Sequence, residues 1–197
     1  RLFDLELLYP IIRSRQYNLN LIGGFTGLNS ESDILNINVS EDRVRYFRGG
    51  GRFDFTDSWA GVTQIDLELA QGVDWFNATD DGLGRSRANG EHDFLRKNIS
   101  VIRLQDLPGN FSTQLSFAGQ HSSDPLLSSE EFSVGGGEYG RAYDSGEISG
   151  DKGISGAVEL RYGGPVPHDF IKSYQLYGFY DVGKVWNEQP AVAEASS

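Results

Sequence analysis

Two residue types are missing from this sequence altogether. Its 197 residues include no cysteine and no methionine. The lack of cysteine excludes disulfides and thiolate metal sites, and it suits an oxidising compartment. There is no initiator methionine, and the first segment, RLFDLELLYP, already has the pattern of a strand. We therefore expect an internal or processed piece of a longer protein.

Positive charge and long apolar runs are scarce. The sequence has 17 Lys and Arg residues and 28 Asp and Glu residues, which gives a net charge of −11. This balance argues against a nucleic-acid partner, because phosphates need a basic surface. No apolar run approaches the ~20 residues of a transmembrane helix. A transmembrane strand needs only ~10 residues, half of them polar. The 25 glycines and 12% aromatic residues favour β structure of that kind or a soluble all-β protein.

Alternation of apolar and polar residues is the dominant pattern. It is strict in NFSTQLSFAGQ (110–120), and it recurs in VTQIDLELAQ (62–71), ISGAVELRY (154–162) and FDLELLY (3–9). Period two over such lengths predicts strands with one apolar and one polar face. We expect strands near residues 2–9, 15–28, 44–57, 60–76, 94–105, 110–121, 154–163 and 174–187. No segment has a convincing helical period.

The connections between these strands alternate between short and long. Long loops are expected at about 29–43, 77–93 and 122–153, with short turns between them. In an up-and-down sheet, this places every long loop at one end, which is typical of outer-membrane barrels. Aromatic residues near strand ends fit an interfacial girdle: Tyr9, Trp59, Trp75, Phe76, Tyr162 and Trp186. We expect an all-β, antiparallel, up-and-down transmembrane barrel with its polar face towards a wet lumen. A soluble β-sandwich lectin is the alternative that would expose this face to bulk water.

Signals for catalysis or metal binding are weak. His92, His121 and His168 are scattered without ligand spacing, and no Ser or Asp has the context of a nucleophile elbow. The GGG triplets lack the Lys-Ser/Thr continuation of a phosphate-binding loop. We expect no enzyme activity, no cofactor and no metal.

One segment carries a specific resemblance. LLSSEEFSVGGGEYGRAYDSGEISGDKGISGAVELRY (126–162) resembles the signature of the outer-membrane transporters of two-partner secretion, the ShlB/FhaC/HecB-type haemolysin secretion/activation proteins. These transporters share a superfamily with the barrel-assembly proteins. Their Val-Arg-Gly-Tyr tetrapeptide is replaced here by Gly-Arg-Ala-Tyr (140–143), which keeps Arg141 and Tyr143. A second family motif, Phe-x-Asp-x-Gly, is present in FYDVGKVW (179–186).

The resemblance implies a partial C-terminal barrel region over residues 1–197, without the periplasmic POTRA domains. About eight strands of a 16-stranded barrel would be present, with the long loop folded into the lumen. The loop would be anchored by a motif of Arg141, Tyr143, Gly150 and Asp151. Its partner on the barrel wall would be the motif of Phe179, Asp181 and Gly183. Alternation separately places Asp181 on the polar face, opposite Tyr180 and Val182.

The same resemblance implies a function in the bacterial cell outer membrane. The pore would pass an exoprotein, an adhesin or cytolysin in extended form, from the periplasm to the cell surface. It would act as a monomer in contact with the lipid bilayer and lipopolysaccharide, without covalent chemistry or nucleic acid. A barrel-assembly factor of the same superfamily and a passive porin are the alternatives.

Overall fold

The computed structural model describes residues 1–34, 37–79, 84–166 and 170–188. Within them, eight long strands form one sheet and two short strands form a separate hairpin. The sheet strands are β1 (Leu2–Arg13), β2 (Tyr17–Ile34), β3 (Ile37–Thr56), β4 (Val62–Gly72), β5 (Leu95–Leu107), β6 (Phe111–Ser122), β9 (Lys152–Pro165) and β10 (Ser173–Trp186). The hairpin strands are β7 (Phe132–Val134) and β8 (Ile148–Gly150), which follow a 3₁₀ turn at Ser128–Glu130.

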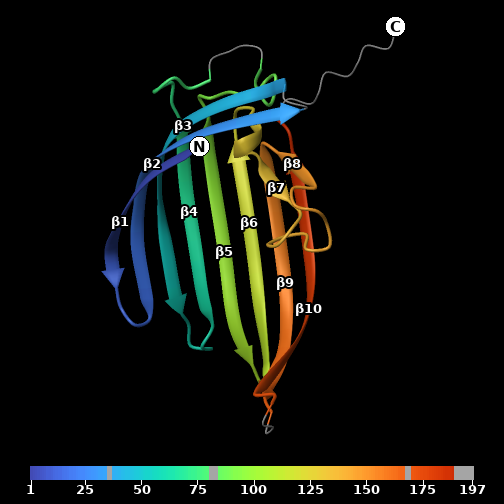
Figure 1. Ribbon diagram of the computed structural model, residues 1–197. Coiled ribbons are helices and arrows are strands. Elements are labelled where there is room, and N and C mark those ends of the chain that lie inside the picture. Colours follow the sequence, from blue (N-terminus) through green and yellow to red (C-terminus); the bar gives the residue numbers. More distant parts are fainter. Residues whose placement is uncertain (35–36, 80–83, 167–169, 189–197) are drawn as a thin grey trace.

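The large sheet is antiparallel and up-and-down. Its order is β1-β2-β3-β4-β5-β6-β9-β10, so each strand pairs with the next sheet strand along the chain. The connections at residues 14–16, 57–61 and 108–110 and the described residues between β9 and β10 lie at one end, which we name the short-turn end. The other connections lie at the opposite, long-loop end (Figure 1). The predicted strands and their end-to-end asymmetry are therefore present.

Several predicted boundaries are wrong. The strand expected at 60–76 spans only Val62–Gly72. The long loop expected at 29–43 is largely a strand hairpin, because β2 and β3 stay paired from Asn29↔Arg43 to Asp33↔Asn38. This extension is rich in polar residues, so no apolar period marks it, although its ladder satisfies the backbone groups. Strand β1 continues through Pro10, with a register shift between Pro10 and Ile12. A proline is tolerated in an edge strand beside a bulge because no ladder hydrogen bond needs its missing N–H.

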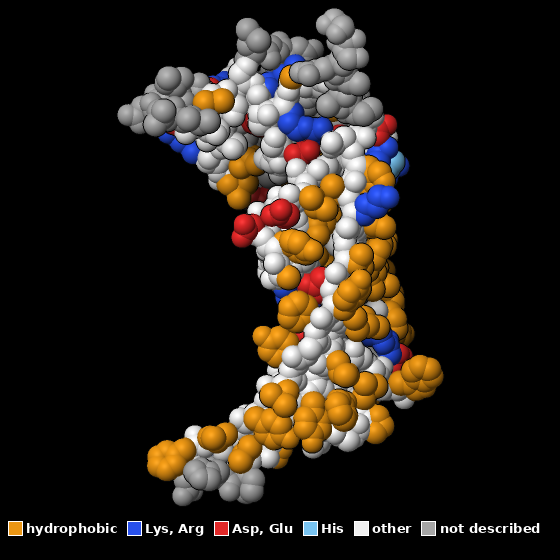
Figure 2. Space-filling view, turned by 90° about the vertical axis from the view of Figure 1, so that its right-hand side faces the viewer, with side chains coloured by type: hydrophobic (Ala, Val, Ile, Leu, Met, Phe, Trp, Pro, Cys, Tyr) orange, Lys and Arg blue, Asp and Glu red, His pale blue; other side chains and the backbone are white. Residues whose placement is uncertain are grey.

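The two faces of the sheet differ in chemistry. We name the face that carries the β7–β8 hairpin the inner face and the opposite one the outer face. Figure 2 shows that the sheet is strongly curved, with hydrophobic side chains spread over its convex side. These outer-face residues include Leu67, Leu115, Val158 and Tyr180, all of which are exposed. An apolar surface this large is not stable in water alone, and it indicates contact with an apolar medium.

Charged residues of the inner face pair across strands. Arg48 of β3 places Nη2 2.7 Å from the carboxylate of Asp4 and 2.9 Å from that of Glu6, both on β1. Further along β3, Arg52 Nε lies 2.5 Å from Asp66 Oδ1 on β4. The polar face is thus a lattice of opposite charges, which stabilises neighbouring strands through cross-strand pairs.

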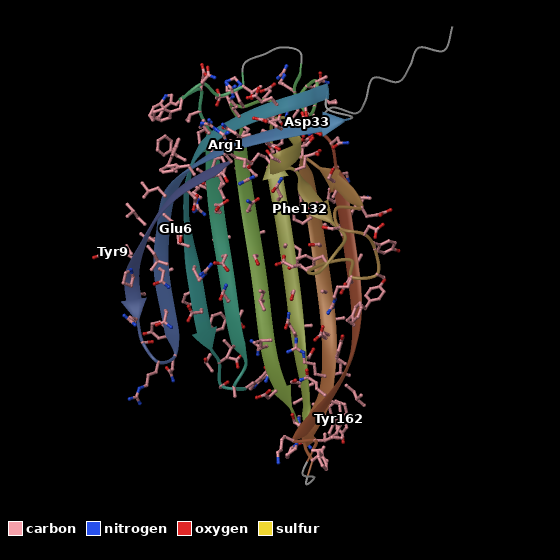
Figure 3. All side chains as sticks on the ribbon, viewed as in Figure 1. Arg1, Glu6, Tyr9, Asp33, Phe132 and Tyr162 are labelled. Carbon is pink, nitrogen blue, oxygen red and sulfur yellow. The ribbon has the colours of Figure 1, made fainter. Side chains whose placement is uncertain are left out.

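Aromatic rings gather near both ends of the sheet. At the long-loop end, Trp75 and Phe76 pack edge to face with Phe47 and Phe25 respectively. At the short-turn end, Tyr162 contacts Phe111 with ring centroids 4.7 Å apart. Figure 3 labels Tyr162 at this lower end of the sheet. The positions are those of two interfacial girdles.

The buried apolar core is small and lies under the long loops. It consists of Val44, Ala70, Phe94, Leu126 and Leu127. Residues 94 and 126–127 come from the connections, so the core joins the loops to the inner face of β3 and β4. In the residues that the structure describes, no helix is long and apolar enough to cross a membrane.

Candidate functional site

The candidate site is the contact between the inner face and the loop at 135–147, which joins β7 to β8. Strand β7 touches β9 and β10, and β8 touches β10. Figure 1 shows the loop descending from the hairpin in front of these strands, and Figure 3 labels Phe132 at the start of the hairpin. The loop thus lies against the inside of the curved sheet.

Glycines allow the loop to make its tight turns. Gly135, Gly136, Gly140 and Gly146 all have positive φ, a region in which other residues are strained. At Gly140, φ is 78°, and its carbonyl accepts a hydrogen bond from the Tyr143 N–H at 2.9 Å. Ala142 is not among the described residues with positive φ. The replacement of the family glycine by Ala142 is therefore compatible with an unstrained tip, because Gly140 supplies the left-handed position.

Arg141 and Asp181 are in direct contact. Arg141 Nη2 donates to Asp181 Oδ1 at 2.8 Å, and Arg141 Nε donates to Oδ2 at 3.1 Å. The backbone N–H groups of Gly140 and Arg141 also donate to Oδ2, at 3.1 and 3.0 Å. This two-pronged geometry is specific to a guanidinium. The Asp181 side chain is 4% exposed and the Arg141 side chain 22%, so the pair is shielded but not dry.

The guanidinium of Arg141 has two further partners on the wall. Its Nη1 pairs with Glu159 Oε2 on β9, and its Cζ lies 3.8 Å from the ring centroid of Phe179 on β10. Glu159 is itself held by Arg161, whose Nε lies 2.6 Å from Oε1. Phe179 therefore acts as a cation–π platform under the arginine. The sequence placed Glu159 on the polar face but did not identify it as an anchor residue.

Gly183 gives the hairpin room to approach β10. A Cβ at this position would lie 2.6 Å from Val134 Cγ1, well inside contact distance. On β9, a Cβ at Gly153 would likewise collide with the ring of Phe132. The Phe-x-Asp-x-Gly motif needs a glycine at this position for a steric reason, because a side chain there would displace β7 from β10.

The remaining predicted anchor residues do not join Arg141. Tyr143 is 67% exposed, and the contact described for it is the backbone hydrogen bond to Gly140. Gly150 pairs with Phe132, and a Cβ on it would lie 2.8 Å from the Trp186 carbonyl oxygen. Gly150 thus permits close packing of β8 on β10. Asp151 belongs to a separate polar cluster at the long-loop end.

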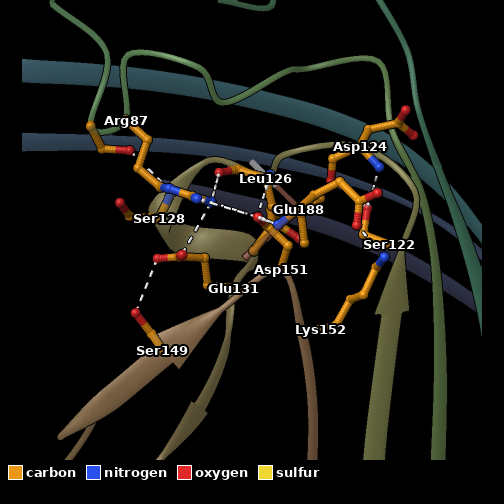
Figure 4. A network of polar contacts seen from close by, with 12 residues as sticks. Arg87, Ser122, Asp124, Leu126, Ser128, Glu131, Ser149, Asp151, Lys152 and Glu188 are labelled. Atoms are coloured by element: carbon orange, nitrogen blue, oxygen red, sulfur yellow. Dashed lines mark hydrogen bonds and ion pairs between the residues drawn. The ribbon is translucent and has the colours of Figure 1, made fainter. Parts of the chain in front are cut away.

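Asp151 forms hydrogen bonds with three segments of the chain (Figure 4). Its fully buried carboxylate accepts hydrogen bonds from the N–H of Leu126 at 2.7 Å and the N–H of Glu188 at 2.9 Å. Arg87 Nη1 donates to Asp151 Oδ1 at 2.5 Å and to the Leu126 carbonyl at 2.7 Å. Arg87 also lies 3.1 Å from Glu131 Oε1. The 77–93 connection is therefore fastened to the loop that carries Arg141.

Sequence reasoning missed Arg87. It lies in RSRANGEHD, a polar stretch without periodicity, between residues 80–83, which are outside the described residues, and β5. Its charge was the one signal in the sequence, because its partner Asp151 is distant along the chain. His168, considered as a metal ligand and set aside, also lies outside the described residues.

A second buried ion pair lies beside this cluster. Glu130, which lies in the segment that resembles the family signature, pairs with Arg96 of β5, and its side chain is only 4% exposed. Arg96 Nη2 also approaches Glu68 Oε1 at 3.5 Å, and its Cζ lies 5.3 Å from the ring centroid of Tyr46. The acid of the signature thus fixes the 3₁₀ turn to the sheet. Removing one member of such a pair leaves a buried charge uncompensated.

The pKa values of Glu130 and Asp151, two buried acids of the long-loop end, are shifted in opposite directions. Burial raises the pKa of Glu130 above its ordinary value, and the charge of Arg96 only partly offsets it. Burial also works against ionisation of Asp151, but hydrogen bonds from Arg87, Leu126 and Glu188 outweigh it and lower the pKa of Asp151. Asp151 is therefore a firmly ionised acceptor.

The geometry of the site is suited to anchoring the loop at 135–147 to the inner face. The acids and bases of the site neutralise one another, and in the described ranges no group of three His, Cys, Asp or Glu side chains is arranged to hold a metal ion. What the arrangement can do is hold a loop against the inner face and release it if the ion pairs break.

Comparison with solved structures shows the same fold in two proteins. CdiB from Escherichia coli superposes with a TM-score of 0.73 at 19% identity, covering 92% of this chain and 38% of that protein. CdiB from Acinetobacter baumannii gives a TM-score of 0.73 at 19% identity, covering 97% of this chain and 33% of that protein. The chain therefore spans about a third of the length of these neighbours, which are β-barrels. The open eight-stranded sheet is thus a section of a barrel wall.

A comparison with curated protein sequences finds no match. Comparison with protein families matches residues 1–195 to the family described as haemolysin secretion/activation protein ShlB/FhaC/HecB. This is a family of secretion proteins and not an enzyme family. With nearly all of its residues matched, the chain belongs to the ShlB/FhaC/HecB haemolysin secretion/activation family.

Proposed function

We propose that this chain forms about half of the wall of a 16-stranded outer-membrane pore. The pore passes a partner exoprotein, in extended form, from the periplasm to the cell surface, and it works as a monomer without POTRA domains in this part of the chain. Family membership and the likeness to CdiB support a two-partner secretion transporter. Lipid bilayer and lipopolysaccharide surround its outer face.

The two faces of the sheet support this location. The outer face exposes apolar side chains over the length of the strands, and the inner face carries paired charges. Outer-membrane barrels have this division between lipid and lumen, and their short turns lie on the periplasmic side. The long-loop end accordingly faces the cell surface. Strands β1 and β10 each leave one edge unpaired in the described sheet, and further strands of the full-length protein would cover those edges.

The observation that carries the proposal is the loop held across the inner face by Arg141. The loop occupies part of the lumen, so an exoprotein on its way out has to displace it or pass beside it. Three wall residues hold the guanidinium: Glu159, Phe179 and Asp181. A contact made of several directional interactions has two discrete states, made or broken, which suits a gate.

The expected strength of this gate is moderate. Arg141 is partly exposed, so solvent weakens each ion pair relative to a dry interior. A net contribution of about 2 kcal/mol is reasonable for charge-assisted hydrogen bonds in such a place. That amount changes the ratio of closed to open loop by about thirtyfold. An entering polypeptide could supply this free energy through its own contacts with the lumen.

The test is secretion by the full-length transporter. Arg141→Ala and Asp181→Ala should change the amount of exoprotein in the medium and raise the conductance of the purified pore in planar bilayers. Arg15→Ala, which removes an exposed arginine from the turn at 14–16, is the matched control and should behave as the native protein does. Native secretion together with native conductance in both anchor variants would refute the gate.

The same assays separate the alternatives. A passive porin would pass small solutes while exporting no partner, whatever the state of Arg141. A barrel-assembly factor would, when depleted, reduce the insertion of other barrels into the outer membrane. Export of one exoprotein with normal insertion of other barrels is the result that the proposal expects.

A further inference from the structure

Three of the four lysines of this acidic chain lie together on the outer face at the long-loop end. They are Lys97 of β5, Lys152 of β9 and Lys184 of β10. Lys97 is directly opposite His121 of β6, and Lys184 is opposite Ile154. The fourth lysine, Lys172, lies in the connection at the short-turn end.

The alternation of each strand fixes the direction of these side chains. Arg96 next to Lys97 is buried against the inner-face loops, so Lys97 points outward, and it is exposed. Gly183 next to Lys184 faces Val134 on the inside, so Lys184 also points outward. The positive charges therefore stand among apolar residues of the outer wall, where isolated charge is costly unless it has a partner.

A groove lies directly beside these charges. Its volume is about 720 Å³, and both Lys97 and His121 line it. Its apolar lining side chains belong to β4, β5, β6 and β9, and they are Leu67, Leu69, Ile99, Phe117 and Ile154. The size is that of ordinary ligand pockets.

The groove exists because several residues of its floor are glycines, which have no side chain to fill it. Gly49, Gly51 and Gly119 line it. A Cβ added at Gly49 would find nothing within 4 Å, so the space there is open. A substitution at this point can fill the groove without disturbing the sheet.

The basic side chains beside the groove have few partners within the protein. In the described part of the chain, Lys97 and His121 make no ion pair or side-chain hydrogen bond. Lys184 lies over the ring of Trp186, with Nζ 5.0 Å from the centroid, which leaves its charge available. Lys152, in contrast, is paired with Glu188. An anionic partner outside the protein would balance Lys97 and Lys184, and His121 could donate a hydrogen bond to it.

From these observations we infer that the groove binds lipopolysaccharide, with an acyl chain of lipid A along its apolar floor and the lipid A phosphates at Lys97 with His121 and at Lys184. The inference rests on the orientation given under the proposed function, which turns the long-loop end towards the outer leaflet. A phosphorylated glycolipid offers the required combination of anionic head group and acyl chain. Lysine ammonium groups suit phosphate, and basic residues at the membrane surface strengthen lipid binding.

Lipid binding to the purified full-length transporter tests the inference. The probes are lipid A carrying its phosphates and the same lipid A after dephosphorylation, each added in detergent and quantified by native mass spectrometry. We expect phosphorylated lipid A to bind at least tenfold more tightly than the dephosphorylated form. Lys97→Ala with Lys184→Ala should weaken binding about twentyfold, because each basic residue contributes about fivefold.

Two further variants locate the site. Gly49→Leu should reduce binding of phosphorylated lipid A about tenfold by filling the groove. Lys172→Ala removes the lysine of the short-turn end and should leave binding unchanged. Equal binding by the double-lysine variant and Lys172→Ala, no effect of Gly49→Leu, or equal binding of the two lipids would each overturn the inference.

The outcome is distinguishable from failure of the proposed function. Lipid binding is measured without any exoprotein, and none of these variants changes the Arg141 contact. Lost lipid selectivity with normal secretion would reject the lipid site alone. Normal lipid selectivity in a protein that exports nothing would reject the secretion proposal and leave the site in place.

Discussion

Arg141 combines interactions that a lysine cannot reproduce. Its guanidinium reaches both oxygens of Asp181, one oxygen of Glu159 and the face of Phe179. A lysine ammonium has a single point of attachment and could serve only one of these partners well. The residue type, and not its charge alone, determines how firmly the loop is held.

We therefore expect Arg141→Lys to loosen the loop even though the charge is kept. The loss should be about 1–2 kcal/mol, since one ion pair survives. Limited proteolysis of the loop at 135–147 in the full-length protein measures it, and cleavage should be several-fold faster than in the native protein. Cleavage at the native rate would show that a point charge is sufficient.

The close packing at Gly183 provides a second residue-scale prediction. Gly183→Ala should displace the β7–β8 hairpin and destabilise it by about 1–3 kcal/mol through overpacking against Val134. Protease sensitivity of the hairpin is again the measurement. Adding Val134→Ala should restore much of the protection, because it removes the atoms that a new Cβ meets.

A matched control is available on the same strand. A Cβ at Gly178 would find nothing within 4 Å, so Gly178→Ala should leave the hairpin as it is in the native protein. If Gly178→Ala and Gly183→Ala had the same effect, the cause would be a general property of β10 and not the contact with Val134.

At the scale of elements, the Asp151 cluster couples two long connections. Asp151 bonds to Arg87 from one connection and to Leu126 from the other, so protonating one carboxyl loosens both. The pKa of Asp151 is lowered in the folded protein. Its stabilisation is therefore fully present above the unfolded value of 3.8 and is lost as pH falls through the lower, folded value.

We expect the native full-length protein to lose thermal stability as pH falls below about 4, partly through this group. Asp151→Asn should be less stable at neutral pH and should show a smaller loss on acidification. Unfolding midpoints of both proteins between pH 3 and 6 provide the comparison. Parallel curves for the two proteins would mean that Asp151 does not contribute to acid sensitivity. The raised pKa of Glu130 works in the opposite direction, so its buried pair cannot produce the same trend.

The sequence predicted those elements whose two faces differ. Alternation placed the eight sheet strands and directed Asp181 to the inner face, and the resemblance named Arg141 as its partner. The polar extension of β2 and β3 was missed because residues 29–34 carry no apolar face, yet their backbones still pair. Hydrogen bonds between backbones leave no trace in composition.

The contacts of the connections were not predictable in the same way. Arg87 and Asp151 are 64 residues apart and meet only because β4, β5, β6 and β9 bring the two connections to one end of the sheet. The pairing of Arg96 with Glu130 has the same origin. Such contacts follow from the completed topology, whereas period and motif are properties of local sequence.

At the scale of the whole molecule, two strand edges limit what this chain can do alone. Strands β1 and β10 present unpaired backbone groups, and the outer face is apolar. We expect the isolated 197-residue chain to aggregate or associate through these edges, as exposed edges do. Size-exclusion chromatography in detergent should show oligomers, whereas the full-length transporter should elute as one barrel. A monodisperse, folded monomer of the isolated chain would contradict this expectation.

The placement of the small apolar core has a consequence for traffic through the lumen. Its five residues come from the connections and from β3 and β4 at the long-loop end, and the inner face below them carries paired charges. Under the proposed function, a polypeptide that enters from the short-turn end would first pass a hydrophilic inner wall with few apolar contacts. It would meet the apolar core and the anchored loops only near the long-loop end, so a stalled chain would remain inside the channel.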